Sequence, residues 1–384
     1  MQDLTQATIT ALLNETEEAP RVTIYAPMHT TASPPHMTEN QIRLKNLARK
    51  ASDKLRHGYQ HQGKNMADML EHQVDEYLNN PQFWEAQTEG LLLCANPSKV
   101  EAFHLPIDTE EYVATDSCYH LAPVLALLDD EQSFYVLTVT QHDPKLFAGS
   151  MYGLCQMETD LPRNLEAALH IDERNQKGDH TQAKGGEVGY NGRGGVRDPR
   201  ADERLRFFRL IDTVVCSATE HGLPLILAGT ESELAEYRSI SRHQRILEQS
   251  IVGSFSGAKP HSLFAPAYGI IREQLVLKRR NQAVQEYARL KGSRQGRVAE
   301  DPLAIAEAAK QGRIDTLLIG LRRTTADTIR DTAKVVERIT FPKAELSALV
   351  NKTANAVASA RGRVINVEVD ALATPTPVMA LLRY

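Results

Sequence analysis

Glycine is unusually concentrated in one part of this sequence. Seven glycines fall within the 18 residues from position 178 to position 195: Gly178, Gly185, Gly186, Gly189, Gly192, Gly194 and Gly195. A glycine backbone can approach a partner closely and present its N–H groups to it. Loops longer than about 12–15 residues are uncommon in compact domains and are usually functional or disordered. We therefore predict a loop at residues 172–198 that contacts a partner; the alternative is a flexible surface loop.

The residues after this loop predict a helix. Asp198 suits the N-cap, and Pro199 suits the first helical position. An apolar stripe at helical spacing follows: Leu205, Phe208, Ile211, Val215 and Ala218. Gly194 and Gly195 thus stand just before a helix N-terminus, where unpaired N–H groups and the helix dipole attract anions.

Charge in this region favours an anionic partner. From Lys184 to Arg209 there are seven basic and four acidic residues, a net charge of +3. No G-x-x-x-x-G-K-[ST] motif is present, and Arg197 replaces the last glycine of a G-x-G-x-x-G motif. The region predicts contact with phosphates, but by neither of the two standard phosphate loops.

A second basic segment runs from Arg272 to Arg297, with eight basic and two acidic residues and a net charge of +6. In a chain of net charge -5, this is the best candidate for contact with RNA phosphates. The alternative is a solvated helix face. The residues predicted to contact RNA in the two segments are Arg193, Arg197, Lys278, Arg279, Arg280, Arg294 and Arg297.

The elements that position these residues indicate three domains. Residues 1–128 are predicted to form an α+β domain, with a strand at 21–27, a helix capped by Thr38 and a second helix at 65–78. Residues 129–258 combine a strand hairpin, the loop, a long helix, the strand at 223–229 and another helix. Residues 259–384 contain a long helix at 272–291, strands at 313–320, 362–368 and 378–384, and helices at 303–311, 328–340 and 343–360. We expect this last domain to be a three-layer α/β/α domain.

Composition excludes several other classes of protein. Hydrophobic residues make up 42% and charged residues 24% of the chain, as in soluble globular proteins. No apolar run reaches the roughly 20 residues needed to span a membrane, and the four cysteines form no disulfide-dense pattern. We expect a cytoplasmic protein with no cofactor and no DNA partner, and the sequence does not indicate the oligomeric state.

Three patterns are weaker candidates for a site. His57 and His61 lie four residues apart, but Gly58 interrupts the helix that would pair them and a third metal ligand is missing. Phe255 takes the serine position in the sequence GSFSG, which excludes a nucleophile elbow. Phe83 and Trp84 are more typical of a core anchor than of a platform for bases. We predict no metal site.

The order of these elements resembles the bacterial archaeo-eukaryotic release factor family, relatives of the archaeo-eukaryotic peptide-release factors and Pelota. The resemblance rests on the hairpin FYVLTVTQ…KLFAGSMYG, a loop with Gly-Gly, the helix RLRFFRLID and the strand PLILAG. It implies a ribonuclease-H-like central domain and a C-terminal domain resembling an RNA-binding ribosomal protein. It also implies that the ribosome or tRNA is the partner.

The resemblance also suggests a reaction. In active release factors this loop carries Gly-Gly-Gln and promotes hydrolysis of the peptidyl-tRNA ester, for which N–H groups must face the developing oxyanion. Gly194 and Gly195 match the two glycines and are the candidate catalytic residues, but Val196 replaces the glutamine. Two hypotheses stay open. One is a release-factor-like protein that rescues stalled ribosomes by this hydrolysis, and the other is a non-catalytic protein- or RNA-interaction module.

Overall fold

The computed structural model describes residues 2–15, 19–29, 34–85, 88–165, 199–220, 222–293, 296–320, 323–326, 336–339, 344–367 and 378–384. Two compact units are present. The first combines residues 1–131 with residues 278–384, and the second spans residues 132–277. The predicted mixed α/β architecture with several sheets is confirmed. The predicted domain limits at 128 and 258 stay a prediction.

The N-terminal sheet has five strands in the order β1-β4-β3-β2-β6. Its strands are β1 (Gln2–Asp3), β2 (Arg21–Pro27), β3 (Gly90–Asn96), β4 (Lys99–Leu105) and β6 (Tyr112–Asp116). All its pairs are antiparallel except β1 with β4. Successive side chains of a strand point to opposite faces. Val22 and Ile24 therefore lie in one core cluster, whereas the buried Thr23 and Tyr25 face the opposite side.

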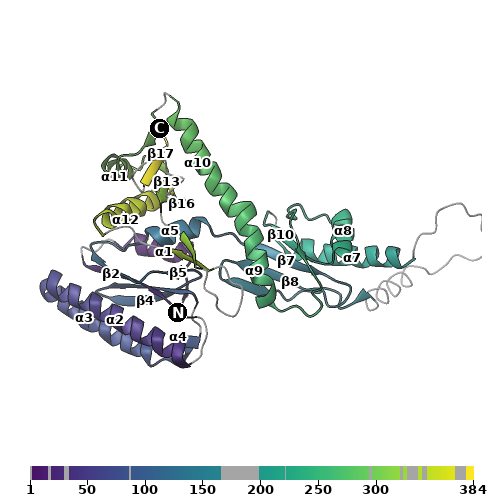
Figure 1. Ribbon diagram of the computed structural model, residues 1–384, viewed down its shortest axis with the longest axis horizontal. Coiled ribbons are helices and arrows are strands. Elements are labelled where there is room, and N and C mark those ends of the chain that lie inside the picture. Colours follow the sequence, from purple (N-terminus) through teal and green to yellow (C-terminus); the bar gives the residue numbers. More distant parts are fainter. Residues whose placement is uncertain are drawn as a thin grey trace, which may run out of the picture. The chain divides into compact units, whose positions relative to one another are not determined.

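Three helices cover the face that carries Val22 and Ile24 (Figure 1). They are α2 (Pro34–Gly58), α3 (Gln60–Leu78) and α4 (Pro81–Glu85). Trp84 of α4 is buried and donates from Nε1 to the carbonyl of Tyr77 at 2.9 Å, so its predicted role as a core anchor is confirmed. The predicted start of the first helix at Thr38 was wrong. The helix begins at Pro34, since proline is tolerated in a first helical turn.

The opposite side of the first unit includes the short helices α1 (Gln6–Leu13) and α5 (Ala122–Asp129). Seven of the eight residues of α5, from Ala122 to Leu128, are buried. A helix that is apolar all round belongs in a protein interior. The segment that was predicted to close the N-terminal domain is therefore packed on all sides.

The central sheet, in the second unit, has the order β11-β10-β7-β8-β9. Its strands are β7 (Phe134–Val139), β8 (Leu146–Ser150), β9 (Gly153–Gln156), β10 (Leu225–Gly229) and β11 (Ile251–Val252). β7, β8 and β9 form an antiparallel meander, and β10 and β11 extend it in parallel from β7. This is the mixed sheet that the sequence indicates.

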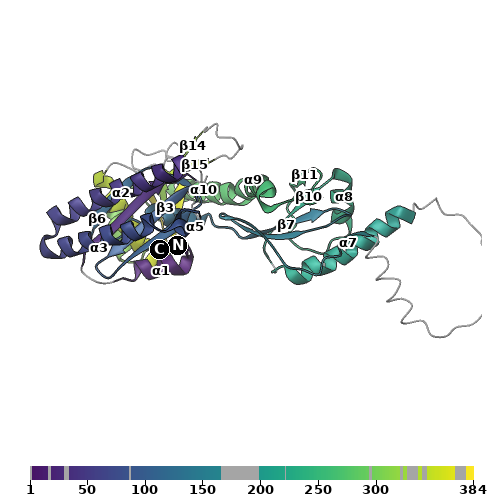
Figure 2. The same ribbon diagram turned by 90° about the horizontal axis from the view of Figure 1, so that it is seen from below.

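Helices cover both faces of the central sheet (Figure 2). Tyr135 and Leu137 pack with α7 (Pro199–Ala218) and α8 (Glu231–Ile240). Phe134 and Val136 pack with α9 (Pro260–Ile271). Because successive side chains of β7 point to opposite faces, helices pack on both sides of the sheet and the unit has three layers. Helix α9 lies beyond the predicted domain limit at residue 258.

The C-terminal part of the first unit contains a four-stranded sheet in the order β12-β17-β13-β16. Its strands are β12 (Val298–Ala299), β13 (Ile314–Gly320), β16 (Arg363–Val367) and β17 (Val378–Leu382). α10 (Lys278–Lys291) packs Tyr287 and Leu290 onto Leu318 and Ile365. The helices α11 (Pro302–Lys310) and α12 (Ala344–Ser359) also contact this sheet and each other.

Two expectations for this region need correction. The long helix predicted at 272–291 is the end of a longer helical run, in which α9 is followed by the π-helical segment η1 (Arg272–Leu277) and then by α10. The helix predicted at 328–340 was wrong for Val336–Ile339, which form strand β15 between β14 (Arg323–Ala326) and β5 (Asp108–Thr109). Pairing with a strand distant in sequence outweighs a short local pattern.

Among the described residues, no helix has the length and the apolar character that crossing a membrane requires.

Candidate nucleic-acid interface

The predicted loop at 172–198 lies outside the described residues, and so do Arg193, Gly194, Gly195 and Arg197. The chain re-enters the described part at α7, whose first residue is Pro199. The helix predicted after the loop is therefore confirmed. Because Pro199 directly follows the predicted loop in the sequence, α7 is the described element next to it.

An aromatic cluster anchors α7 on the central sheet. Phe207, Phe208, Ile211 and Val215 are fully buried, and the Phe208 ring meets the Tyr237 ring of α8 edge-on at 6.2 Å between centroids. Burial of an aromatic side chain contributes on the order of 2–3 kcal/mol. Its buried face therefore holds α7 firmly on the central sheet.

A buried carboxylate strengthens this support. Asp212, in the middle of α7, is 1% exposed. Its Oδ1 accepts from the Tyr237 hydroxyl at 3.1 Å and from the Ser241 hydroxyl at 2.5 Å, and its Oδ2 accepts from the Arg242 backbone N–H at 3.0 Å. Burial, followed by the nearby Asp212 carboxylate, raises the pKa of Tyr237. The carboxylate thus joins α7 to the end of α8.

Asp212 was not among the residues predicted from the sequence, although a signal was present. Asp212 follows Phe208 by four residues and precedes Val215 by three, so it lies on the apolar face of the helix. A carboxylate at such a position must be paired or hydrogen-bonded.

The arginines of α7 divide into two groups. Arg204 forms a bidentate pair with Glu236 of α8, at 2.9 Å and 3.1 Å, and is only partly exposed. Arg206 and Arg209 are exposed. These two cations lie within the first three turns of the helix that follows the loop, where a phosphate can reach them from solvent.

On the second basic segment, Arg280 supports the fold. It is buried on α10 and forms a bidentate ion pair with the buried Asp130, with Nε 3.0 Å from Oδ1. A phosphate in solvent cannot reach a guanidinium held in this way. Arg280 was predicted to contact RNA. In the structure it joins α10 to Asp130, directly after α5.

Other cations of this segment also have protein partners. Arg279 donates to the Asp129 carbonyl at 2.7 Å, and Arg297 donates to the Arg383 carbonyl at 2.8 Å. Arg289 pairs with Glu286, and Lys291 pairs with Glu300. Arg294 lies outside the described residues. Lys278 is exposed, at the start of α10.

The predicted RNA contacts are also far apart along this segment. Lys278, Arg279 and Arg280 follow one another at the first turn of α10, and Arg297 lies beyond its other end. At 1.5 Å per residue, α10 separates the two ends by about 20 Å. The described cations of this segment therefore do not form one compact cluster.

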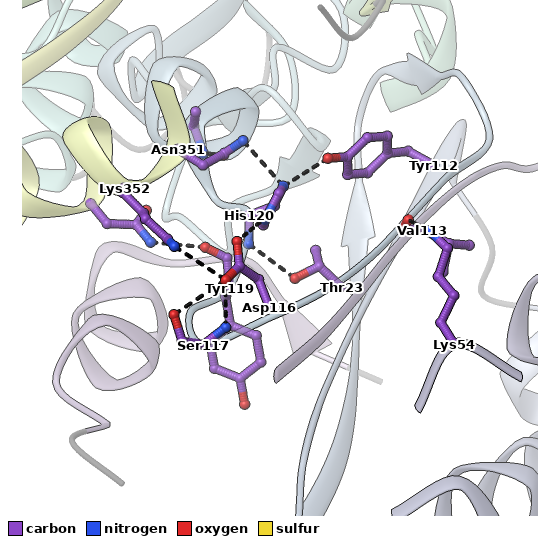
Figure 3. A network of polar contacts seen from close by, with 12 residues as sticks. Thr23, Lys54, Tyr112, Val113, Asp116, Ser117, Tyr119, His120, Asn351 and Lys352 are labelled. Atoms are coloured by element: carbon purple, nitrogen blue, oxygen red, sulfur yellow. Dashed lines mark hydrogen bonds and ion pairs between the residues drawn. The ribbon is translucent and has the colours of Figure 1, made fainter. Parts of the chain in front are cut away.

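A second polar cluster, absent from the sequence analysis, surrounds His120 in the first unit (Figure 3). The His120 ring contacts the Tyr112 hydroxyl through Nδ1 at 2.7 Å and Asp116 through Nε2 at 3.4 Å. Asn351 of α12 lies 3.3 Å from the same Nδ1 and accepts from the Ala122 N–H at 2.9 Å. The cluster therefore holds α12 against the segment between β6 and α5.

Opposing electrostatic effects act inside this cluster. Burial lowers the pKa of His120, although the Asp116 carboxylate acts in the opposite direction. Burial would raise the pKa of Asp116, but the Ser117 N–H and the Lys352 ammonium at 3.3 Å outweigh it and leave that pKa below its ordinary value. The arrangement favours a neutral imidazole beside an ionised carboxylate. All the contacts described for the ring are with other residues of this unit, so the cluster links α12 to the segment between β6 and α5.

A comparison with protein families finds a match for the segment that contains the loop and both basic helices. Residues 133–313, a little less than half of the chain, match the model of Bacterial archaeo-eukaryotic release factor family 3. The resemblance inferred from the hairpin, the loop and α7 is thereby confirmed. No curated protein matches the chain significantly.

The solved structures similar to this chain include archaeal proteins. The archaeal translation termination factor aRF1 has 13% sequence identity, with 100% of this chain and 99% of that chain covered and a TM-score of 0.23. Archaeoglobus fulgidus Pelota has 12% identity, 100% and 94% coverage and a TM-score of 0.31. The model of ribosome-bound archaeal Pelota and ABCE1 has 12% identity, 100% and 95% coverage and a TM-score of 0.35.

Proposed function

We propose that this protein is a release-factor-like translation factor that binds a tRNA on the ribosome. The observation that carries the proposal is the match of residues 133–313 to a release-factor family. That segment includes the glycine-rich loop, α7 with its exposed Arg206 and Arg209, and α10. A cytoplasmic location follows from this role.

The architecture supports the domain identities that the family implies. An antiparallel meander extended by two parallel strands, with helices on both faces, is compatible with a ribonuclease-H-like central domain. We assign this domain to residues 129–277, because α9 and η1 group with the central sheet. Residues 1–128 form the N-terminal domain. The third domain, predicted to begin at 259, then begins at 278 and is the one that resembles an RNA-binding ribosomal protein.

The finer proposal concerns the loop. Gly194 and Gly195 can bring backbone N–H groups to the ester of a peptidyl-tRNA, where donors stabilise developing oxyanion charge. Arg193 and Arg197 flank the two glycines and suit contact with the neighbouring phosphates. In this form the protein rescues stalled ribosomes by releasing the nascent peptide.

Val196 favours a second candidate, a binding module without hydrolysis. Release factors of this type place glutamine after the two glycines, and the valine side chain at this position cannot hydrogen-bond to water. Binding through the loop and the exposed arginines does not need the missing amide. In this form the protein occupies the site without releasing the peptide.

Sedimentation with ribosomes at low and high salt tests the common part of both candidates. We expect the protein in the ribosomal fraction at low salt and its loss at high salt, because phosphate contacts weaken with salt. If the protein is absent from every ribosomal fraction at low salt, the proposal fails.

A double substitution, Gly194→Ala with Gly195→Ala, separates the two candidates. Release of a labelled peptide from stalled ribosomes by the wild type, and its loss in the double variant, supports hydrolysis. Binding by the wild type without release supports the module. Val196→Gln is the matched gain-of-function variant, because it restores the glutamine of the active loop.

A further inference from the structure

The N-terminal domain brings two histidines and a glutamate together at one end of β2. His29 follows β2, and His36 and Glu39 lie in the first two turns of α2. Their ligand atoms all lie within 4.8 Å of one another. The group was not predicted from the sequence, because its members are spread over eleven residues and do not follow a metal-binding motif.

The distances fit a small metal ion. Nε2 of His29 lies 3.0 Å from Oε2 of Glu39, and Nδ1 of His36 lies 3.8 Å from the same oxygen. The two imidazole rings lie 4.7 Å apart between centroids. Ligands of tetrahedral zinc lie about 2.0–2.2 Å from the ion, which puts neighbouring ligand atoms about 3.3 Å apart. The three donors therefore need only small shifts to share one ion.

Neighbouring side chains hold the donors in place. Asn40 is buried and binds the His29 backbone twice, accepting from its N–H and donating to its carbonyl, each at 3.0 Å. Arg43 contacts Oε1 of Glu39 at 3.3 Å, whereas the two histidines approach Oε2. Arg43 is itself balanced by Glu111 at 3.1 Å. Partners of this kind orient metal ligands.

An ion pair alone does not explain the group. A close contact with Glu39, at 3.0 Å, accounts for the position of Nε2 of His29. Nδ1 of His36, in contrast, is buried from solvent and has no hydrogen-bond partner among the described residues. Buried polar atoms without a partner are rare, and each requires an explanation. The Nδ1 atom lies 3.8 Å from Oε2 of Glu39, the oxygen that His29 also approaches, and a shared cation would satisfy all three atoms.

We propose that His29, His36 and Glu39 form a binding site for a divalent transition-metal ion, with zinc as the best-fitting ion. Two imidazoles and one carboxylate are a common zinc ligand set, and they leave a fourth position for water. The ion would link the end of β2 to the start of α2. This inference is independent of the proposed function.

The same domain offers matched controls. His57, the histidine considered in the sequence analysis, lies near the end of α2, whereas His61 belongs to α3, so the two do not share a helix. His72 and Glu76 on α3 form an exposed pair at 3.9 Å without a third ligand. His72→Ala therefore removes a histidine beside a glutamate without touching the proposed site.

The test is zinc titration of the full chain after treatment with a chelator, in competition with a chromophoric chelator. We expect one zinc ion at this site, binding at least about 10-fold weaker in His36→Ala and unchanged in His72→Ala. His36 is partly exposed, so its substitution leaves the core intact, and circular dichroism checks this. Glu39→Gln is the second variant, and we expect it to weaken binding as well.

Cobalt supplies a readout that does not depend on affinity. Tetrahedral Co²⁺ bound to nitrogen and oxygen ligands absorbs visible light, so the wild type and His72→Ala should give this band and His36→Ala should lose it. Zinc binding that both His36→Ala and Glu39→Gln leave unchanged would place the ion elsewhere, for instance on the exposed Cys155, and would overturn the proposal. Failure of the wild type to bind zinc would overturn it too.

Discussion

α7 and α10 are both rich in arginine, but they use it differently. On α10, Arg280 is buried against Asp130, and Arg289 pairs with Glu286 of its own helix. On α7, one arginine pairs with Glu236, whereas Arg206 and Arg209 are exposed. Among the described residues, the segment with the larger net charge in the sequence therefore does not offer the larger number of available cations.

A basic segment binds phosphates only through the cations that remain exposed in the folded protein. Contact with a phosphate requires a cation that faces solvent, and a guanidinium that already has a carboxylate partner contributes to the fold instead. A count of charges along the sequence cannot separate the two cases. We therefore propose that the main RNA contact is made by the loop and α7 rather than by α10.

Removal of the Arg280 side chain should have the largest effect on stability. Arg280→Ala leaves Asp130 buried and uncompensated, and we expect a loss of about 3–5 kcal/mol in the free energy of unfolding. Denaturation with urea, followed by circular dichroism, measures it. Lys278→Ala, two residues away and exposed, is the control and should stay within about 0.5 kcal/mol of the wild type. Equal effects of the two substitutions would contradict the buried role of Arg280.

Asp212→Ala should have the next largest effect. The substitution removes the acceptor of the Tyr237 and Ser241 hydroxyls and of the Arg242 N–H, and an unsatisfied buried donor costs about 1–3 kcal/mol. The same urea assay measures the loss. Asp202→Ala, exposed on the same helix, provides the comparison. If both variants unfold at the same urea concentration, Asp212 does not anchor α7.

Substitution of the exposed arginines should change binding and leave stability unchanged. For Arg206→Gln with Arg209→Gln, we expect weaker tRNA binding and a salt slope of the binding constant reduced by about 1 for each residue. Fluorescence anisotropy with labelled tRNA at several salt concentrations measures both. Arg289→Gln is the matched control, because Arg289 is exposed but paired with Glu286. A larger effect of the control than of the double variant would reverse the comparison between α7 and α10.

Much of the fold could be predicted from local patterns. The run of aromatic and β-branched residues at 133–141 predicted β7, and the apolar residues at helical spacing after Pro199 predicted α7. The helix expected at 328–340 failed in part, since β15 forms by pairing with β5, a strand more than 200 residues earlier. The local sequence around residues 336–339 does not show that a distant strand will pair with them.

The candidate site was less predictable, for the same physical reason. The sequence shows that Arg280 is basic, but its burial depends on Asp130, 150 residues earlier. The group of His29, His36 and Glu39 depends on how the end of β2 meets α2. The residue types indicated that phosphate contacts or metal binding were possible. Which side chains are exposed, paired or close together depends on the fold.

The smallest effect that we predict concerns His120, another group whose partners lie within the fold. Burial lowers its pKa in the folded state, so the unfolded chain binds more protons and stability falls as the pH drops below about 6.5, the ordinary pKa of histidine. Asp116 also has a lowered pKa, but its contribution is lost only nearer its ordinary value of about 4, outside this range. Urea unfolding between about pH 7.5 and 5.5 should show a decline in the wild type that is smaller in His120→Gln. His72→Gln, exposed on α3, should keep the wild-type decline, and an identical decline in all three proteins would show that His120 is not the group that senses protons.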